Sequence, residues 1–407
     1  MDRIAIEPRP DWKHLVESQG MLYVTTRLDG GGEVPYWFEN AYYRFTLPEI
    51  DRLEQVTREL HEMCVAAARH VLERGDLAAF ALPEDARAYL LRTLDEDHPS
   101  LYGRFDLAWG GATGGIAEPK LLEYNADTPT TLIEASMIQW FWLRDRFPDR
   151  DQWNSLHERL VRAWQRMAPR LASEVVHFAH VGGTDFDEEW LTASYLRDTA
   201  TEAGLTTVGL EVADIGWHDG ALRFVDLEDR VIDTMFVLYP WEDMLTDPFG
   251  RHAVDHPDTV RFLEPAWKAV LSNKAILATL WELYPGHPNL LPAYLDSPRE
   301  LTSYVAKPLH GREGDSVRIV TPDSEYVHPS VDYDGSEGWC FQEYVRLPNL
   351  DGNQVVLGSW IVDGKAAGLG VRESDGPVTD FYARFVPHIV DTPAPSEAER
   401  TRWLEED

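Results

Sequence analysis

Cysteine and positive charge are both scarce in this 407-residue sequence, and each shortage argues against a class of protein. The two cysteines, Cys64 and Cys340, are too few for a disulfide framework, and we interpret both as packing residues. The 37 basic residues face 70 acidic ones, which gives a formal net charge of −33. This balance argues against nonspecific binding to nucleic-acid phosphates and against docking on anionic membrane surfaces.

Long apolar runs, repeats and low-complexity tracts are missing as well. No charged-then-apolar leader opens the sequence, and no apolar run reaches about 18 residues. We therefore expect a cytoplasmic protein with access to ATP. What is present is typical of a globular chain, with 44% hydrophobic and 11% aromatic residues, and the length allows roughly two to three domains.

The spacing of apolar residues predicts helices first and a mixed α/β region after them. A capping box, with Thr46 as N-cap and Glu49 three residues later, predicts a helix over 47–74. Further helices are expected over 131–146, 151–172, 187–203 and 266–284. Strands are expected over 175–179, 206–212 and 231–239, and β-hairpins are expected over 215–225 and 355–372. The proline-containing stretch 240–265 is expected to be a loop.

Two neighbouring strand-like segments place polar side chains on a common face. Alternation puts Arg104 and Asp106 on one face of the first segment, and Glu123 and Asn125 on one face of the second. If the segments pair, two carboxylates and one amide converge, which is an oxygen donor set suited to Mg²⁺, and Arg104 beside them could hold a phosphate. A half-exposed hairpin with a polar outer face also fits this spacing. The glycine-rich stretch 110–115 lacks a phosphate-loop ending and is interpreted as the hairpin connection.

A pair of lysines forms a second candidate site. Lys274 lies in the predicted helix, and Lys307 ends a short apolar strand that precedes a glycine-containing loop over 310–316. A lysine on an apolar strand is costly unless its ammonium group meets an anion, and the following loop could cover nucleotide phosphates. A surface or snorkelling lysine is the alternative.

Two further segments carry polar groups on strands. Gln342 and Glu343 lie in an apolar strand-like run, where they could present donors and acceptors to a purine edge. Arg372 follows small residues and could reach a phosphate. A plain strand and a structural ion pair are the respective alternatives. No zincin motif, nucleophile elbow or catalytic triad is visible.

Together these segments resemble the glutathionylspermidine synthase family, in its synthetase part, from about residue 10 to 392. The resemblance is carried by the order and spacing of several short motifs: Arg104-Phe105-Asp106, Glu123-Tyr124-Asn125-Ala126-Asp127-Thr128-Pro129-Thr130, Leu271-Ser272-Asn273-Lys274, Lys307-Pro308-Leu309-His310-Gly311-Arg312-Glu313-Gly314, Phe341-Gln342-Glu343-Tyr344, Gly368-Leu369-Gly370-Val371-Arg372-Glu373 and Arg384-Phe385-Val386-Pro387-His388.

The resemblance implies an α/β (α+β) chain with an ATP-grasp fold and an associated α/β pre-ATP-grasp-like domain. It implies an ATP- and Mg²⁺-dependent ligase that joins a peptide carboxylate to an amine through an acyl phosphate. By resemblance the site residues take these roles: Mg²⁺ on Asp106, Glu123 and Asn125; ATP phosphates on Lys274, Lys307 and Gly314; adenine beside Gln342, Glu343, Tyr344 and Val345; and the transferred phosphoryl group on Arg104 and Arg372.

The resemblance also indicates where the substrates bind. Thr128 and Thr130 match positions near the peptide substrate. The acidic cluster Asp187-Glu188-Glu189 loosely matches one that the family uses near its substrates, and a helix N-terminus enriched in acidic residues is the alternative. Some relatives have serines where this chain has the two threonines, and bifunctional relatives carry an additional amidase domain. Glutathione-like peptides and polyamine-like amines are the leading small-molecule partners, and a homodimer is left open.

Two other functions are weighed against the ligase. One is a kinase-like enzyme that uses the same nucleotide site without an amine acceptor, and the other is a non-catalytic nucleotide-binding protein. The expected organisation is an N-terminal helical region with the metal-binding hairpin over 1–172, a substrate-side α/β domain over 173–265, a nucleotide-binding region over 266–392 and a tail over 393–407.

Overall fold

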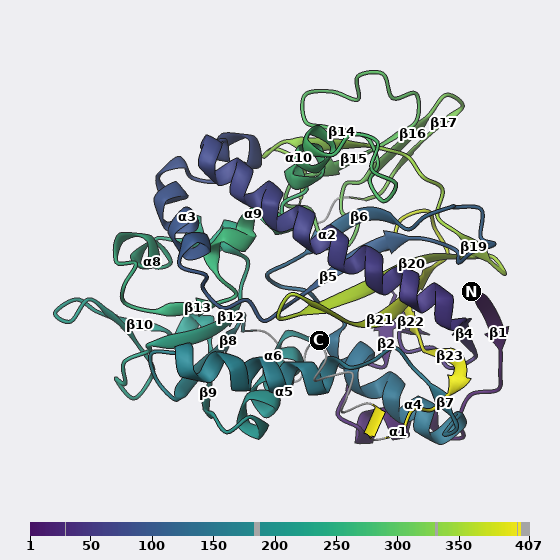
Figure 1. The fold of residues 1–407 in the computed structure, drawn as a ribbon, viewed down its shortest axis with the longest axis horizontal. Coiled ribbons are helices and arrows are strands. Elements are labelled where there is room, and N and C mark those ends of the chain that lie inside the picture. The colour runs from purple at the N-terminus through teal and green to yellow at the C-terminus, as the bar shows by residue number, and fades with distance from the viewer. Residues whose placement is uncertain (29, 183–187, 330–332, 397, 400–407) are drawn as a thin grey trace.

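The computed structural model describes the chain except for residues 29, 183–187, 330–332, 397 and 400–407 (Figure 1). The chain forms a mixture of α-helices and β-sheets, which confirms the predicted α/β fold class. The longest helix is α2 (Leu47–Arg74), which begins at the predicted capping box and ends at Gly75 with a φ of +78°. Most of the tail over 393–407 lies outside the described residues. In the described part, no helix is long and apolar enough to cross a bilayer.

An antiparallel sheet at the centre of the molecule runs in the order β22-β21-β20-β5-β6. Its strands are β5 (Tyr102–Ala108), β6 (Lys120–Asn125), β20 (Asn353–Val362), β21 (Lys365–Ser374) and β22 (Arg384–Val386), and β19 (Asn349–Leu350) pairs with β20. The sheet therefore combines strands from the first and last thirds of the sequence. The hairpin predicted over 355–372 is confirmed as β20–β21, which turns at Asp363 and Gly364.

Alternation along β5 gives the central sheet two chemically different faces. Phe105 and Leu107 are fully buried in the core cluster that α2 supplies with Leu53, Val56 and Leu60. Figure 1 shows α2 running across this face of the sheet. Arg104 and Asp106 consequently point to the opposite face, where the candidate site lies.

Beside this sheet lies a parallel sheet in the order β13-β12-β8-β9. Its strands are β8 (Val175–His180), β9 (Thr206–Glu211), β12 (Thr234–Leu238) and β13 (Arg261–Leu263), and α6 (Glu188–Glu202) connects β8 to β9. The predicted hairpin over 215–225 is confirmed as β10 (Gly216–His218) and β11 (Arg223–Val225). The expected loop over 240–265 is wrong, because it holds α7 (Trp241–Thr246), α8 (Arg251–Asp255) and β13.

The third sheet, in the order β14-β18-β15-β16-β17, lies at the upper end of the molecule as viewed in Figure 1. It contains β14 (Ala293–Tyr294), β15 (Tyr304–Pro308), β16 (Arg318–Thr321), β17 (Ser324–Val327) and β18 (Trp339–Glu343). The single helix expected over 266–284 is wrong: α9 (Ala269–Ser272) and α10 (Ala275–Leu283) are separated at Asn273. Asn273 takes an extended conformation, accepts a hydrogen bond from Ala275 N and donates one to Phe80 O.

The remaining elements cover the ends of the central sheet. A small sheet joins β1 (Asp2–Ala5), β4 (Ala41–Phe45), β23 (His388–Pro393) and β7 (Arg150–Asp151), and β2 (Thr25–Arg27) pairs with β3 (Glu33–Pro35). The other helices are α1 (Trp12–Ser18), α3 (Arg87–Asp95), α4 (Gln139–Arg146) and α5 (Leu156–Met167). The helix predicted over 131–146 is present from 132, with a π-helical turn at Glu134–Ile138 inside it.

Candidate active site

The two segments that carry the predicted metal face form a strand pair. In the β5–β6 register Arg104 lies opposite Asn125, and Asp106 lies opposite Glu123. The Asn125 amide donates to Glu123 Oε1 at 3.2 Å. All four side chains therefore share one face, as the alternation predicted.

A third strand brings a second arginine to the same place. Asp106 accepts from Arg104 Nε at 2.8 Å and from Arg104 Nη2 at 3.3 Å, and it also accepts from Arg372 Nη2. Gly358 of β20 lies opposite Asp106, and a Cβ there would lie 3.0 Å from Arg104 Cδ. The glycine therefore leaves room for the guanidinium to lie along the sheet. Asp106, 4% exposed, thus holds two cations in fixed positions.

Two lysines close the other side of this cluster. Lys274 Nζ lies 3.3 Å from Glu123 Oε2 and donates to the carbonyl of Gly311. Lys307 Nζ donates to Leu122 O and to Gln342 Oε1, both at 2.8 Å. Burial opposes a charge on Glu123, but the two ammonium groups hold its pKa well below its usual range. Burial lowers the pKa of Lys307 to about 8, against the opposing effect of Glu123.

The segment expected to border adenine connects the third sheet to the central one. The Gln342 amide donates to Leu121 O at 2.9 Å as well as accepting from Lys307, so both of its ends are used inside the protein. Glu343 is exposed, and Tyr344 and Val345 are half-buried. Tyr344 packs with an apolar cluster of the third sheet, whereas Val345 packs with one on the central sheet. The chain therefore crosses between the two sheets at these residues.

The glycine-containing loop between β15 and β16 lies close to the cluster. Gly314 has a φ of +73°, and a Cβ at this position would overlap Val378 Cγ1. Its neighbour Glu313 has a raised pKa because of burial and the charge of Glu188, with Arg372 acting in the opposite direction. The loop thus approaches the arginine side of the site, and its role as a covering loop stays a prediction.

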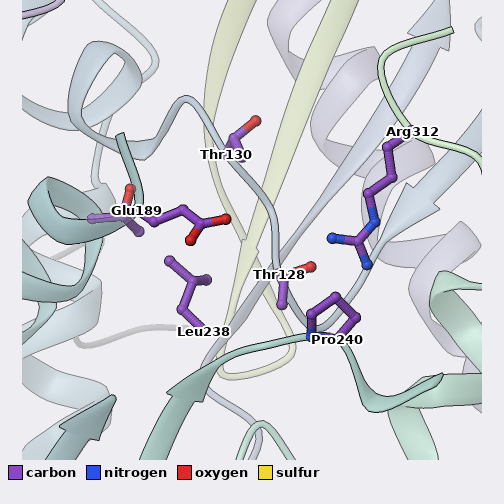
Figure 2. Close-up of a pocket in the computed structure, with 7 residues that line it drawn as sticks. Thr128, Thr130, Glu189, Leu238, Pro240 and Arg312 are labelled. Carbon is purple, nitrogen blue, oxygen red and sulfur yellow. The ribbon is translucent and has the colours of Figure 1, made fainter. Parts of the chain in front are cut away.

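Three of the four predicted substrate residues, Thr128, Thr130 and Glu189, line a small pocket beside the cluster. The pocket is lined by Thr128, Thr130, Glu189, Thr192, Leu238, Pro240 and Arg312. Figure 2 shows Glu189 and Arg312 pointing into it from opposite sides, with the two threonines between them. Glu188 does not line this pocket; its Oε1 accepts from Thr131 N at 2.9 Å. Asp187, the first member of the acidic cluster, lies outside the described residues.

Several residues that the sequence reasoning did not single out belong to this region. Glu134 is fully buried; Tyr36 Oη donates to its Oε1 at 2.6 Å, and its Oε2 has no hydrogen-bond partner among the described residues. Burial and the charge of Glu188 raise the pKa of Glu134. A carboxylate in an apolar stretch (Leu132-Ile133-Glu134-Ala135) is a signal that could have been used.

Arg312 and Glu242 form a second overlooked pair. Arg312 Nη2 donates to Glu242 Oε1 at 2.9 Å, across the gap between the glycine-containing loop and α7. Burial and the charge of Asp127 raise the pKa of Glu242, although Arg312 acts against this shift. Asp127 itself is 3% exposed and accepts from Ser272 Oγ, from Thr128 N at 2.8 Å and from Trp241 N at 3.2 Å. Arg312 belongs to the motif that runs from Lys307 to Gly314, but nothing in the sequence linked this arginine to Glu242.

The donor chemistry of the cluster fits a hard cation. Asp106, Glu123 and the carbonyl of Asn125 offer only oxygen atoms, which Mg²⁺ prefers, and a nucleotide would supply the remaining oxygens. No group of three or more His, Cys, Asp or Glu side chains is arranged to hold a metal within the part of the chain that is described. A metal here would therefore rest on two carboxylates and one amide, with the arginines and lysines beside it as partners for phosphate oxygens.

The fold as a whole has a counterpart among solved structures. A glutathione synthetase-like effector from Globodera pallida, solved in its apo form, superposes with a TM-score of 0.59 at 10% identity, over 93% of this chain and 95% of the other. The protein is thus an α/β protein with the fold of the glutathione synthetase-like ATP-grasp proteins.

The sequence comparison defines the family. Residues 3–391 match the family described as glutathionylspermidine synthase preATP-grasp, and the chain belongs to that family. A Haemophilus influenzae protein named "Putative acid–amine ligase" is 38% identical over 93% of this chain and 97% of its own length. The trypanothione synthetase of Crithidia fasciculata and the bifunctional glutathionylspermidine synthetase/amidase of Escherichia coli are each 27% identical, over 92% and 86% of this chain. The chain spans 59% of the length of each of these two relatives.

Membership confirms the family resemblance and the enzyme class. The relatives are named as ligases and synthetases, so the chain is an ATP-dependent ligase of the acid–amine class. The non-catalytic alternative is thereby set aside. The division of the chain into domains and the roles of individual site residues stay predictions.

Proposed function

We propose that this enzyme uses ATP and Mg²⁺ to join the carboxylate of a glutathione-like peptide to a polyamine-like amine. The observation that carries the proposal is the convergence of Arg104 and Arg372 on Asp106, with Lys274 beside Glu123 and Lys307 close by. Four cations around two carboxylates can neutralise a triphosphate and an acyl phosphate. No nucleophilic side chain is needed for such a reaction.

The reaction has two steps. An oxygen of the peptide carboxylate attacks the γ-phosphorus of ATP, and ADP leaves as the acyl phosphate forms. The neutral amine nitrogen then attacks the acyl carbon, the amide C–N bond forms, and inorganic phosphate leaves. The protein's contribution is alignment and charge neutralisation rather than covalent catalysis.

The roles of the charged residues follow from their positions. Arg104 and Arg372 would steady the transferring phosphoryl group, because Asp106 aims both guanidinium groups at the same place. Mg²⁺, held by Asp106, Glu123 and Asn125, would supply additional charge neutralisation for the phosphate oxygens. The Asp106 and Glu123 oxygens now paired with side-chain donors would be shared with the metal.

The nucleotide would lie between the third sheet and the central sheet. Lys274 and Lys307 would contact its phosphates, and the loop at Gly314 would cover them and exclude water from the acyl phosphate. The base would lie against the segment Gln342 to Val345, where the chain crosses between two apolar clusters. Gln342 would act by holding Lys307 in place, since both ends of its amide are already bonded.

The substrates would meet at the pocket next to the arginines. Thr128 and Thr130 offer hydroxyl groups and Arg312 a cation to a peptide carboxylate. Glu188 and Glu189, with Glu134 behind them, form an acidic region that can bind an ammonium group and accept its proton. The amine must lose that proton before it can attack the acyl carbon.

An ADP-release screen of peptides crossed with amines, with mass spectrometry of the products, tests the proposal. We expect release that requires both substrates and Mg²⁺, and a product mass equal to the two substrates minus water. ADP release without any amine, together with a phosphorylated product, would instead support the kinase-like alternative. As a site test, Arg372→Ala should lower kcat more than it weakens ATP binding; equal losses would indicate uniform binding.

A further inference from the structure

An ion pair attaches the loop between β15 and β16 to α7. Arg312 Nη2 lies 2.9 Å from Glu242 Oε1, and the Glu242 side chain is only 12% exposed. Other contacts hold the two ends of the loop: Lys274 Nζ donates to Gly311 O, and Asp315 Oδ2 accepts from Tyr333 N at 3.0 Å. The pair between Arg312 and Glu242 therefore ties the middle of the loop to α7.

Glu242 is itself fixed relative to the substrate pocket. It lies in the first turn of α7, and the preceding residue, Trp241, donates its backbone N–H to Asp127 at 3.2 Å. Asp127 also accepts from the backbone of Thr128, a residue that lines the pocket. Asp127 thus links the start of α7, which carries Glu242, to the backbone of the pocket residue Thr128.

Keeping a charge at Glu242 is unfavourable in this position. The carboxylate is buried and lies near the negative charge of Asp127, and both effects disfavour its ionised form. A buried ion pair is weak evidence for stabilisation, because the cost of desolvating both charges can exceed their attraction. The arrangement is better explained by what the carboxylate does to Arg312.

We propose that Glu242 is a positioning residue that holds the Arg312 guanidinium over the Thr128–Thr130 pocket, so that the acid substrate meets a fixed cation. A guanidinium has five N–H donors, and Glu242 occupies one, which leaves others directed toward the pocket seen in Figure 2. Without Glu242 the long arginine side chain regains its rotamer freedom, and the substrate must order it again on binding. This inference rests on the proposed function for the nature of the substrate.

The first measurement is hydrogen exchange of the full chain, read on the peptide that covers 309–317. Glu242→Gln keeps the shape and removes the charge, and we expect at least threefold faster exchange in this peptide. Asp85→Asn removes a comparable carboxylate partner from Arg251 at the surface and serves as the matched control, with no change expected. Arg312→Ala and the double variant with Glu242→Gln should exchange alike, because either change breaks the same pair.

The second measurement is steady-state kinetics, with glutathione and spermidine as the probe substrates. Glu242→Gln should raise KM for glutathione about tenfold, leave KM for ATP unchanged and lower kcat less, and Glu242→Asp should recover most of the loss. A merely structural role would instead lower the melting temperature and change all kinetic constants together.

The outcomes separate the two ideas. If exchange at 309–317 is unchanged in Glu242→Gln, or if KM for ATP rises as much as KM for glutathione, the positioning role is wrong. If exchange at 309–317 becomes faster as expected but no acid and amine are joined, the proposed function is wrong, whereas the ion pair between Glu242 and Arg312 still orders the loop. If Glu242→Gln does not fold, Arg312→Ala and Glu242→Asp test the same ion pair by the same exchange and kinetic measurements.

Discussion

Replacing Asp106 by asparagine tests the centre of the site without any ligand. Asp106 accepts three hydrogen bonds from Arg104 and Arg372, both largely buried. An asparagine of the same shape has only one acceptor oxygen, so in either orientation its amide group faces at least one guanidinium N–H. Removing one partner of a buried, charged set costs about 3 kcal/mol or more. We therefore expect the free energy of unfolding to fall by about 3 kcal/mol.

Urea denaturation followed by tryptophan fluorescence, without ATP or magnesium, measures this loss. Asp391→Asn is a suitable control, because its pair with Arg150 is nearly half exposed and such pairs contribute about 0–1 kcal/mol. A loss for Asp106→Asn no larger than that of the control would refute the view that this carboxylate holds both arginines in place.

Four further changes test other parts of the argument. Gly314→Ala should lower kcat at least tenfold, because the new methyl group overlaps Val378 at a positive φ, and the same enzyme with Val378→Ala added should recover part of the rate. Lys307→Met should weaken Mg·ATP binding in calorimetry at least tenfold, and full activity would exclude the lysine from the site. Glu123→Gln should raise the Mg²⁺ concentration needed for ATP binding, and an unchanged requirement would count against its role as a ligand. Burial lowers the pKa of His388 to about 3, so below pH 6.5 the unfolded chain binds a proton that the folded chain does not. The contribution of this residue to stability should therefore fall by about 2 kcal/mol from pH 7 to 5, and His388→Gln should reduce the overall pH dependence by that amount.

The sequence predicted best where local patterns and short-range pairing decide the structure. The capping box at Thr46 located the start of α2, and alternation in β5 and β6 placed Asp106 and Glu123 on one face. It failed where tertiary contacts override local preference. Asn273 breaks a helix because its side chain bonds to Phe80 O, and prolines did not prevent α7 and α8 from forming.

The candidate site shows the same limit. Asp106, Lys307 and Arg372 could be named from their residue types on strands, but the partner of each depends on which strands become neighbours. The pair Glu242–Arg312 joins segments that no periodicity relates, and the buried carboxyl of Glu134 could be recognised only as a polar residue in an apolar stretch. Roles that depend on one side chain limiting another's movement therefore emerge only from coordinates.

The central sheet also bears on how the protein is made. Strand β5 ends at Ala108, whereas its hydrogen-bonded neighbour β20 begins at Asn353. A ribosome must therefore synthesise most of the polypeptide before β5 can pair with β20. Until then one edge of β5 is open to pairing with strands of other chains, and the apolar face of α2 is exposed to association with them. Newly made chains should depend on chaperones late in synthesis, and truncated chains that stop before β20 should aggregate rather than fold.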